Sequence, residues 1–544
     1  MMGRSTKRIC AAMAALLMTA TVLAGCGNDN AAADASAAET TAQTEVTEKK
    51  YTEISALYAE IRTEYNENLD LSDYPLTPNN VPADYKATYE AEEGILTDGC
   101  RAFEDNGIGF VEGPNNQADS LTFKINVEHD GFYDLNFISK TDNADRVNFV
   151  ALDGDKIGEI QCAEAGGFTD SWLKSVYMTA GEHEVSVLCS WGYIVYDRLD
   201  ITCSTLINED TYKITAELSN PNADDRTKRL YKFLCDVYGK YSLTGQFADE
   251  GRKSSEIEKI RAATGKDFAV LGLDVSGYSS CSVANGSKSN TVEYAYDWYN
   301  NGGGIVQLCW HWTTPEPYCV NDQANPWYSS FYKEGSRIDL DKAMNGEDQE
   351  AYDLLMADID AMAVELARLR DAGVPVIWRP LHEASGGWFW WGNCEAESYI
   401  KLWNAMYDKM TNEHNLTNLI WEWNGQDPTW YPGDETVDIV SYDIYAGNHV
   451  YTSYSGTFSE CVESSSERKL VALSENGCVM DPDLVMRDNA RWLFWGTWSD
   501  PFTLKLGVVL NEEYTEKDLL IKAYNSERTL TLDELPDLKN YPLD

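Results

Sequence analysis

Apolar segments of strand length alternate with amphipathic helical segments from Arg229 onward. The clearest helix spans residues 350–372, where apolar side chains recur at helical spacing. Eight strand–helix repeats over about 300 residues predict an α/β fold, a (β/α)8 TIM barrel, which we assign to residues 229–540. A doubly wound sheet is the alternative, but no GxGxxG motif follows the first strand, which argues against a dinucleotide-binding fold. The expected strands are 241–247, 268–276, 304–312, 374–383, 416–424, 437–445, 470–475 and 492–498.

A different pattern precedes the barrel. Residues 84–204 contain short alternating segments separated by Gly, Asp and Asn, and they lack helical periodicity. This spacing predicts an all-β sandwich. On its amino-terminal side, segment 51–83 combines a helical stretch at 54–65 with a link that contains three prolines. Residues 205–228 form the expected connector to the barrel.

The first residues of the chain have the pattern of an export signal. Basic residues precede an apolar run at 11–23, and Leu-Ala-Gly-Cys then ends at Cys26. This order is typical of a signal peptide, here 1–26, rather than of a transmembrane span. Leu-Ala-Gly-Cys also resembles a bacterial lipobox, in which Cys26 becomes the lipidated first residue; an ordinary signal with an incidental cysteine is the alternative. Residues 27–50 are small and polar without aromatics, which predicts a disordered tether.

Charge and composition narrow the possible partners. The formal net charge of −46 predicts a surface that repels nucleic acid and anionic headgroups, whereas a neutral polymer meets no such barrier. The 17 Trp and 32 Tyr exceed what a folding core requires, and binding of a substrate with flat apolar faces is one explanation. No HExxH motif and no cluster of His or Cys ligands appears, so we expect no catalytic cofactor. We also expect the protein to be a monomer.

Residues 376–392, VIWRPLHEASGGWFWWG, place acid–base chemistry beside aromatic rings. A carboxylate and a histidine, Glu383 and His382, follow an apolar strand, and Trp388 and its neighbours come next. Pyranose rings pack their apolar faces on indoles, and a glycosidic oxygen needs a proton donor before its bond breaks. The alternative is a strand that runs into an aromatic core loop.

A second carboxylate, Glu475, lies in Ser-Glu-Asn-Gly at the end of the seventh expected strand. Barrel enzymes hold their catalytic groups at the carboxyl ends of strands, so Glu383 and Glu475 are expected to face each other. Retaining glycosidases need two carboxyl groups roughly 5–5.5 Å apart, one as acid/base and one as nucleophile. Arg379 is expected within reach of the nucleophile, where it would hold that carboxyl anionic.

Four motifs carry a family resemblance: WRPLHE at 378–383 with GGWFWWG after it, SENG at 474–477, CWHW at 309–312 and YPGD at 431–434. With them, residues 228–538 resemble the family-26 glycoside hydrolases, best known as endo-β-1,4-mannanases. The resemblance implies that Glu383 is the acid/base and Glu475 the nucleophile. It also implies a set of substrate-binding residues: His311, His382, Trp388, Tyr445, Trp495 and Trp498. Arg379 is expected to join this set. Of the other rings in the same stretch, Trp390 and Trp391 are expected to brace the loop.

The sandwich segment carries a resemblance of its own. Tyr-Glu-Ala-Glu at 89–92, Gly-Phe-Val at 109–111 and the stretch that ends at Asp197 resemble a family-35 carbohydrate-binding module. The resemblance implies a structural calcium held by Glu90, Glu92 and Asp197, and hard oxygen ligands suit that ion. A solvated strand edge is the alternative. The sugar-contacting Asn that relatives often place two residues before the late Asp is Val195 here, which weakens the expectation of sugar affinity.

Together these patterns predict a retaining endo-β-1,4-mannanase that acts on β-mannan polysaccharide, lipid-anchored on the extracellular face of a bacterial cell membrane. One alternative is the same barrel acting on another β-glycan, such as mixed-linkage glucan or xylan, because the catalytic pair does not select the sugar. The other is a lipoprotein that captures polysaccharide without cutting it. Presence of both Glu383 and Glu475 favours an enzyme.

Overall fold

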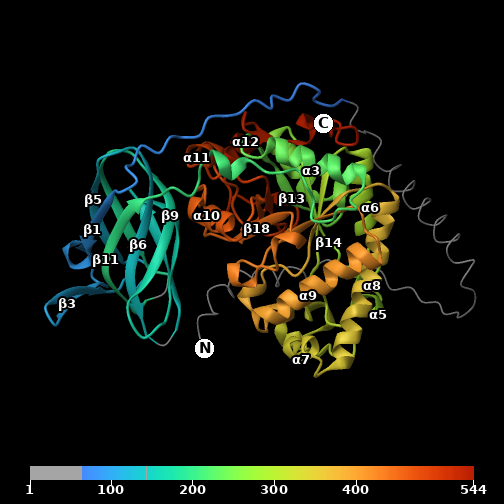
Figure 1. Ribbon diagram of the computed structural model, residues 1–544, viewed down its shortest axis with the longest axis horizontal. Helices are drawn as coiled ribbons and strands as arrows, with labels where there is room; N and C mark the ends of the chain where they lie inside the picture. Colours follow the sequence, from blue (N-terminus) through green and yellow to red (C-terminus); the bar gives the residue numbers. More distant parts are fainter. Residues whose placement is uncertain (1–63, 143, 191, 544) are drawn as a thin grey trace, which may run out of the picture.

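The computed structural model describes residues 64–142, 144–190 and 192–543, which form two units (Figure 1). A β-sandwich module comes first, drawn in blue to teal, and a closed eight-stranded barrel follows in green to red. The fold class expected from the sequence is therefore confirmed. Cys26 lies outside the described residues. The expected helix at 54–65 also lies outside them, except for positions 64 and 65, which are not helical.

The module is a sandwich of two antiparallel sheets. One sheet has the order β3-β4-β11-β6-β9, with β1 also paired to β11, and the other has the order β2-β5-β10-β7-β8. Alternating apolar residues of β5, among them Leu121, Phe123 and Ile125, point into the core between the sheets. The strands are β1 Lys86–Glu90, β2 Ile95–Leu96, β3 Arg101–Asp105, β4 Ile108–Glu112, β5 Ser120–Val127, β6 Gly131–Thr141, β7 Arg146–Leu152, β8 Asp155–Cys162, β9 Thr169–Met178, β10 Gly181–Leu188 and β11 Ile194–Cys203.

Eight parallel strands close the barrel, because β20 pairs back with β13 through Thr497 and Gln246. The strands are β13 Gly245–Phe247, β14 Val270–Asp274, β15 Ile305–Cys309, β16 Val376–Arg379, β17 Leu419–Trp423, β18 Ile439–Ile444, β19 Leu470–Asn476 and β20 Trp495–Thr497. Each lies within its expected segment except β19, which ends one residue later at Asn476. The fourth is the most shortened, since residues 374–375 and 380–383 lie outside β16.

Helices surround the barrel. The longest, α8, spans Gln349–Asp371, close to the expected 350–372, and the Asp348 side chain caps it by accepting from the N–H of Ala351. Small sheets accompany the barrel: β12 Ser242–Leu243 with β23 Thr529–Leu530, and β21 Leu504–Lys505 with β22 Val509–Leu510. The other helices are α3 Asp225–Val237, α4 Ser255–Thr264, α5 Ser280–Ala284, α6 Thr291–Tyr296, α7 Leu340–Met344, α9 Ala396–Asp408, α10 Ser455–Glu463, α11 Pro482–Arg487 and α12 Lys517–Tyr524.

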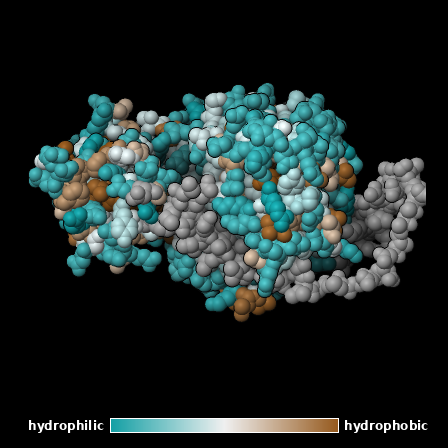
Figure 2. Space-filling view, turned by 90° about the horizontal axis from the view of Figure 1, so that it is seen from below, coloured by the Kyte–Doolittle hydropathy of each residue, from teal (hydrophilic) through white to brown (hydrophobic). Residues whose placement is uncertain are grey.

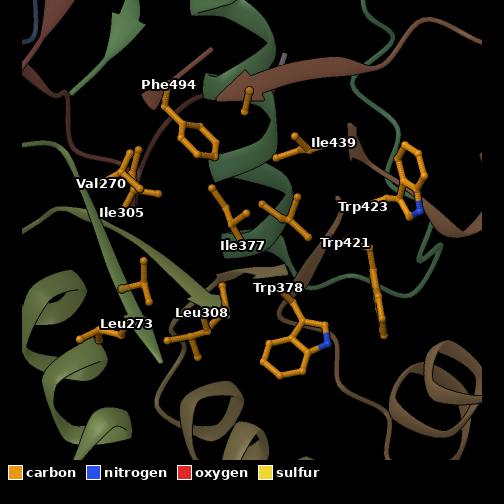
Figure 3. Packing of buried hydrophobic residues seen from close by; sticks show 14 of the residues in the cluster. Val270, Leu273, Ile305, Leu308, Ile377, Trp378, Trp421, Trp423, Ile439 and Phe494 are labelled. Carbon is orange, nitrogen blue, oxygen red and sulfur yellow. The ribbon is translucent and has the colours of Figure 1, made fainter. Parts of the chain in front are cut away.

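The barrel core explains why its strands read as continuous apolar runs. Strand residues that face outward, such as Leu308, Trp378 and Trp421, are fully buried beneath the helices (Figure 3). Parallel strands covered on both faces need apolar side chains on both faces. The barrel interior is partly polar, and the Gln307 amide donates to the Glu422 carboxylate at 2.7 Å.

The module packs on the barrel through its strand β9 and the barrel helix α10 (Figure 1). Leu173 of β9 lies so close to Gly456 of α10 that an added Cβ there would meet its Cδ1 at 2.8 Å. An ion pair between Lys174 and Glu463 flanks this contact. The two units are therefore joined by a packed interface as well as by the connector.

The surface is largely hydrophilic, as the composition predicts, with small hydrophobic patches on the face in Figure 2. Among residues 64–543, no helix has the length and apolar character needed to cross a membrane.

Candidate active site

Two glutamates meet at the carboxyl ends of barrel strands. Glu475 lies within β19, and Glu383 lies four residues beyond the end of β16. Carboxylate oxygens of Glu383, Glu475 and Asp443 lie within 4.8 Å of one another. The Glu383–Glu475 separation suits a retaining glycosidase, because an inverting enzyme needs about 6.5–9.5 Å to admit a water between the groups.

The backbone that presents Glu383 is strained. Leu381 and Glu383 both adopt left-handed conformations, with φ of 51° and 53°. Non-glycine residues adopt this region at a cost of order 1–3 kcal/mol, and such strain concentrates at functional sites. The Glu383 N–H donates to the carbonyl oxygen of Asn424 at 2.7 Å, and the Trp391 indole donates to the His382 carbonyl at 2.8 Å. These bonds hold the turn in place.

Glu383 has the environment of a general acid. Burial, reinforced by the nearby negative charge of Glu475, raises the pKa of Glu383 to about 7. The Trp388 indole N–H donates to Glu383 Oε2 at 2.8 Å, which lowers the pKa in part. The carboxyl group therefore stays protonated at a pH where an ordinary glutamate would be ionised.

This pKa predicts the basic limb of the pH–rate profile. A general acid acts in its protonated form, so with Glu383 in the expected role kcat/KM should fall as pH rises through about 7. In Trp388→Phe the lost hydrogen bond to the carboxylate should move this limb to higher pH. Trp403→Phe is the matched control, because its buried indole donates to the Thr436 hydroxyl at 3.1 Å instead of to a carboxylate. A limb that stays in place in Trp388→Phe, or moves to lower pH, would contradict the assignment.

Glu475 is held by two strong donors. Arg379, fully buried at the end of β16, donates from Nη1 to Glu475 Oε1 at 2.7 Å. The Tyr445 hydroxyl donates to Oε2 at 2.5 Å. Arg379 also pairs with Asp443 and bonds the Asn424 side chain at 3.4 Å. Both donors bind and orient the Glu475 carboxylate, as a carboxylate nucleophile requires.

Tyr445→Phe is expected to lower kcat on polysaccharide by about 10- to 100-fold, because a hydrogen bond to a charged group is worth about 1.5–3 kcal/mol. The thermal midpoint should change little. Tyr454→Phe is the control, since its hydroxyl donates to the carbonyl oxygen of Val450 at 3.1 Å instead of to a carboxylate. Equal rates for wild type and Tyr445→Phe would show that the tyrosine does not act on Glu475.

Two histidines form a hydrogen-bonded pair beside the carboxyl groups. His311 Nδ1 bonds Asp274 Oδ2 at 2.8 Å, and its Nε2 lies 3.2 Å from Nε2 of His382. Burial alone would lower the pKa of His311, but the Asp274 carboxylate outweighs it and raises that pKa. Burial, with the positive charges of Arg379 and His311, lowers the pKa of His382 well below its ordinary value. These opposite shifts favour a proton on His311 over one on His382.

The aromatic residues of the site form two groups: some line the cleft, and others hold the loop after β16 in place. Trp498 packs on Phe247 at 4.6 Å between ring centroids and lies 5.8 Å from the His311 ring. Trp388 and Trp498 both line the cleft. The indole of Trp390 donates to the Trp312 carbonyl at 2.7 Å, which places it as a brace of the loop, together with Trp391.

The prediction that Trp495 contacts substrate is wrong. Trp495 is buried and lies against Tyr524 of α12, 6.4 Å between ring centroids, beside a separate small cavity. Successive side chains of a strand point to opposite faces, and at this position of β20 the indole points outward to the helices. Trp498 follows the carboxyl end of β20 and reaches the cleft instead.

Several site residues were missed from the sequence. Asp443 and Asn424 share Arg379 with Glu475, and Asp274 holds His311. Each lies at or near the carboxyl end of an expected strand, which is the signal that could have identified them. Tyr332, from the long insertion between the third and fourth strands, also lines the cleft.

These groups open into a large cleft of about 1800 Å³. Small-molecule pockets typically enclose about 300–1,000 Å³, so the volume suits a polymer better than a single small ligand. Among the residues expected in substrate binding, those that line the cleft are His311, His382, Trp388, Tyr445 and Trp498.

In the module, Glu90, Glu92 and Asp197 gather where β1 meets β11. Burial, followed by the charges of Asp197 and Glu92, raises the pKa of Glu90. Arg198 pairs with Asp197 and offsets part of the repulsion. The charges of these acids therefore interact, although the trio is not among the clusters of described residues whose donor atoms all lie within 4.8 Å of one another.

Two carboxyl groups at this separation, in a barrel cleft walled by indole rings, define a glycoside hydrolase. Comparison with known proteins gives the family. Residues 219–534 match the model of glycosyl hydrolase family 26, and residues 87–204 match carbohydrate-binding module family 35. The chain belongs to glycosyl hydrolase family 26 and carries a family-35 module on its amino-terminal side.

The similarity extends over both units. A mannan endo-1,4-beta-mannosidase of Thermothelomyces thermophilus is 36% identical over 462 residues, 84% of this chain and 92% of that protein. Mannan endo-1,4-beta-mannosidase B of Piromyces sp. is 33% identical and spans 83% of this chain and 77% of its own length. The crystal structure of a GH26-CBM35 β-(1,4)-mannanase of Podospora anserina superposes with a TM-score of 0.58 at 35% identity, covering 84% of this chain and all of that one.

Proposed function

We propose that this chain is a retaining endo-β-1,4-mannanase, which hydrolyses internal β-mannosidic bonds of mannan, galactomannan or glucomannan through a covalent intermediate. The observation that carries this proposal is the placement of Glu383 and Glu475, with carboxylate oxygens within 4.8 Å in one cleft. The relatives named as mannan endo-1,4-beta-mannosidases support the choice of substrate.

The first step forms a glycosyl ester. A Glu475 carboxylate oxygen attacks the anomeric carbon, and the bond from that carbon to the glycosidic oxygen breaks. Glu383 transfers its proton to the departing oxygen, so the leaving sugar departs as an alcohol. Arg379 and Tyr445 bind the attacking carboxylate in the correct orientation at 2.7 and 2.5 Å.

The second step regenerates the enzyme. A water attacks the anomeric carbon from the side that the leaving group vacated, and Glu383, now ionised, accepts its proton. The ester bond to Glu475 breaks and restores the carboxylate, which the donors from Arg379 and Tyr445 stabilise. Two inversions give net retention of configuration.

Product analysis on a substrate panel tests the proposal. Ivory-nut mannan, glucomannan, lichenan and xylan are incubated with the enzyme, and released oligosaccharides are separated by size. We expect a mixture of short manno-oligosaccharides from the mannans and little from lichenan or xylan. Cleavage of lichenan or xylan with no cleavage of mannan would overturn the substrate class, and release of monosaccharide alone would overturn internal cleavage.

We propose that Glu90, Glu92 and Asp197 bind a structural calcium in the module. Three carboxylates supply hard oxygen donors, and a divalent cation would relieve their mutual repulsion, which adds to burial in raising the pKa of Glu90. Calcium should raise the thermal midpoint of the module's unfolding, and Glu92→Gln should remove this response. An unchanged midpoint with calcium and with chelator would contradict the site.

We propose that the chain acts outside the cell and that Cys26 anchors it to a membrane by a lipid. The proposal rests on the export signal and on Leu-Ala-Gly-Cys before a small polar segment. Cells fed a radiolabelled fatty acid should label the wild-type protein but not Cys26→Ser. Label on both proteins, or on neither, would show that Cys26 is not the site of a lipid anchor.

A further inference from the structure

The cleft that holds the catalytic pair continues onto the module. Its lining includes Glu383, Glu475 and Trp498 of the barrel and, in the same cavity, Phe149 and Trp172 of the module. The barrel residues that line the cleft on this side run from β18 to α10, the helix on which the module packs. One continuous space of about 1800 Å³ is therefore bounded by both units.

The module is held with a defined face toward this space. Strands β8 and β9 each lie at one edge of their sheet, and β9 lies against α10. Leu173 packs at Gly456, and Lys174 pairs with Glu463. A ligand that spans both units would therefore meet a preformed wall, which lowers the entropy lost on binding.

The module's part of the wall has the chemistry that binds neutral sugars. Trp172 is one of the few large apolar side chains that remain exposed, at 38%, and it lines the cavity. Phe149 of β7 also lines it, with the Lys156 ammonium 4.2 Å from its ring centroid. Flat rings pack on the apolar faces of pyranoses, and polar groups beside them bond hydroxyls. Gln161 and Glu159 of β8 supply such groups here.

We propose that the β7–β8–β9 face of the module forms distal subsites of the catalytic cleft, which bind a neutral β-linked polysaccharide chain several sugars away from the cleavage point. The module then extends the active site instead of acting only as a separate anchor on the substrate. This inference rests on the proposed function, because it assigns further contacts to the same substrate chain.

Chain-length dependence of turnover tests the proposal. Rates are measured on manno-oligosaccharides of four to eight sugars and on soluble mannan for wild type, Trp172→Ala and Phe149→Ala. Loss of one aromatic platform should lower kcat/KM about five- to tenfold on mannan and by a smaller factor on the tetrasaccharide. The gain in kcat/KM with chain length in the wild type should be flattened in both variants.

Tyr193→Ala is the matched control, because Tyr193 is a 72% exposed aromatic of the same module that lies outside the cleft lining. It should follow the wild-type length curve. Binding of the octasaccharide to Glu475→Ala, with and without Trp172→Ala, gives a second readout that needs no turnover, and we expect about a fivefold weaker Kd in the double variant.

The outcomes separate this inference from the proposed function. Wild-type cleavage of mannan, with variants that follow the wild-type curve and bind the octasaccharide equally well, would overturn the distal subsites and leave the mannanase intact. A wild type that releases nothing from any mannan would overturn the proposed function itself. Equal losses at every chain length would show a structural effect of the substitutions and would also overturn the subsites.

Discussion

Replacing Glu475 by alanine is expected to lower kcat on mannan by about 10⁵-fold, because it removes the carboxylate that attacks the anomeric carbon. The fold should survive. Arg379 keeps its ion pair with Asp443 when Glu475 is removed, so the substitution leaves no buried charge without a partner. The thermal midpoint and the affinity for manno-oligosaccharides should therefore remain close to those of the wild type.

Two further measurements sharpen this result. Glu475→Gln keeps the size of the side chain and should be as inactive as Glu475→Ala, since the amide is a poor nucleophile. Sodium azide should restore turnover only in the alanine variant, where space is left for the anion, and the product should be a glycosyl azide of inverted configuration. Substantial activity of Glu475→Ala without azide would refute the nucleophile assignment.

Replacing Glu383 by alanine is expected to slow hydrolysis of mannan by about 10³- to 10⁴-fold, the range that general acid catalysis contributes. The loss should be far smaller for formation of the glycosyl ester from aryl glycosides with good leaving groups, which need little protonation. Pre-steady-state release of the phenol measures this first step separately from the hydrolysis of the ester.

Glu383→Gln provides the control for packing, because the amide retains a partner for the Trp388 indole while it cannot donate a carboxylic proton. The basic limb near pH 7 should disappear from the residual activity of both variants. Equal losses on mannan and on activated aryl glycosides would show that Glu383 is not the acid.

The barrel and its catalytic pair could be predicted because both leave local signals. Strands covered on both faces read as apolar runs, and α8 shows helical spacing over its whole length. Glu383 and Glu475 follow or end such runs, and the barrel rule places their carboxyl groups together. The expected sandwich also followed from alternation within strands such as β5 and β10.

Other features depend on contacts between distant segments and leave no local signal. Trp495 and Trp498 are three residues apart in an aromatic stretch, and only the exact position of β20 decides which of them reaches the cleft. Asp443 lies in an apolar strand, and its role becomes visible only through its ion pair with Arg379. The packing of β9 on α10 joins segments almost 300 residues apart, so the continuous cleft could not be predicted from the sequence.

Hydrolysis is expected to proceed through a glycosyl ester on Glu475. In a 2-deoxy-2-fluoro-mannosyl-type fluoride, the fluorine at C2 disfavours the oxocarbenium-like transition state of both steps. The anomeric fluoride is a good leaving group that keeps the first step fast, so the ester forms readily and breaks down slowly. Peptide mass spectrometry of the inactivated enzyme should find one added glycosyl group, located on Glu475. A label on any other residue, or rapid turnover of mannan by an enzyme that the reagent never labels, would show that Glu475 does not carry the glycosyl ester.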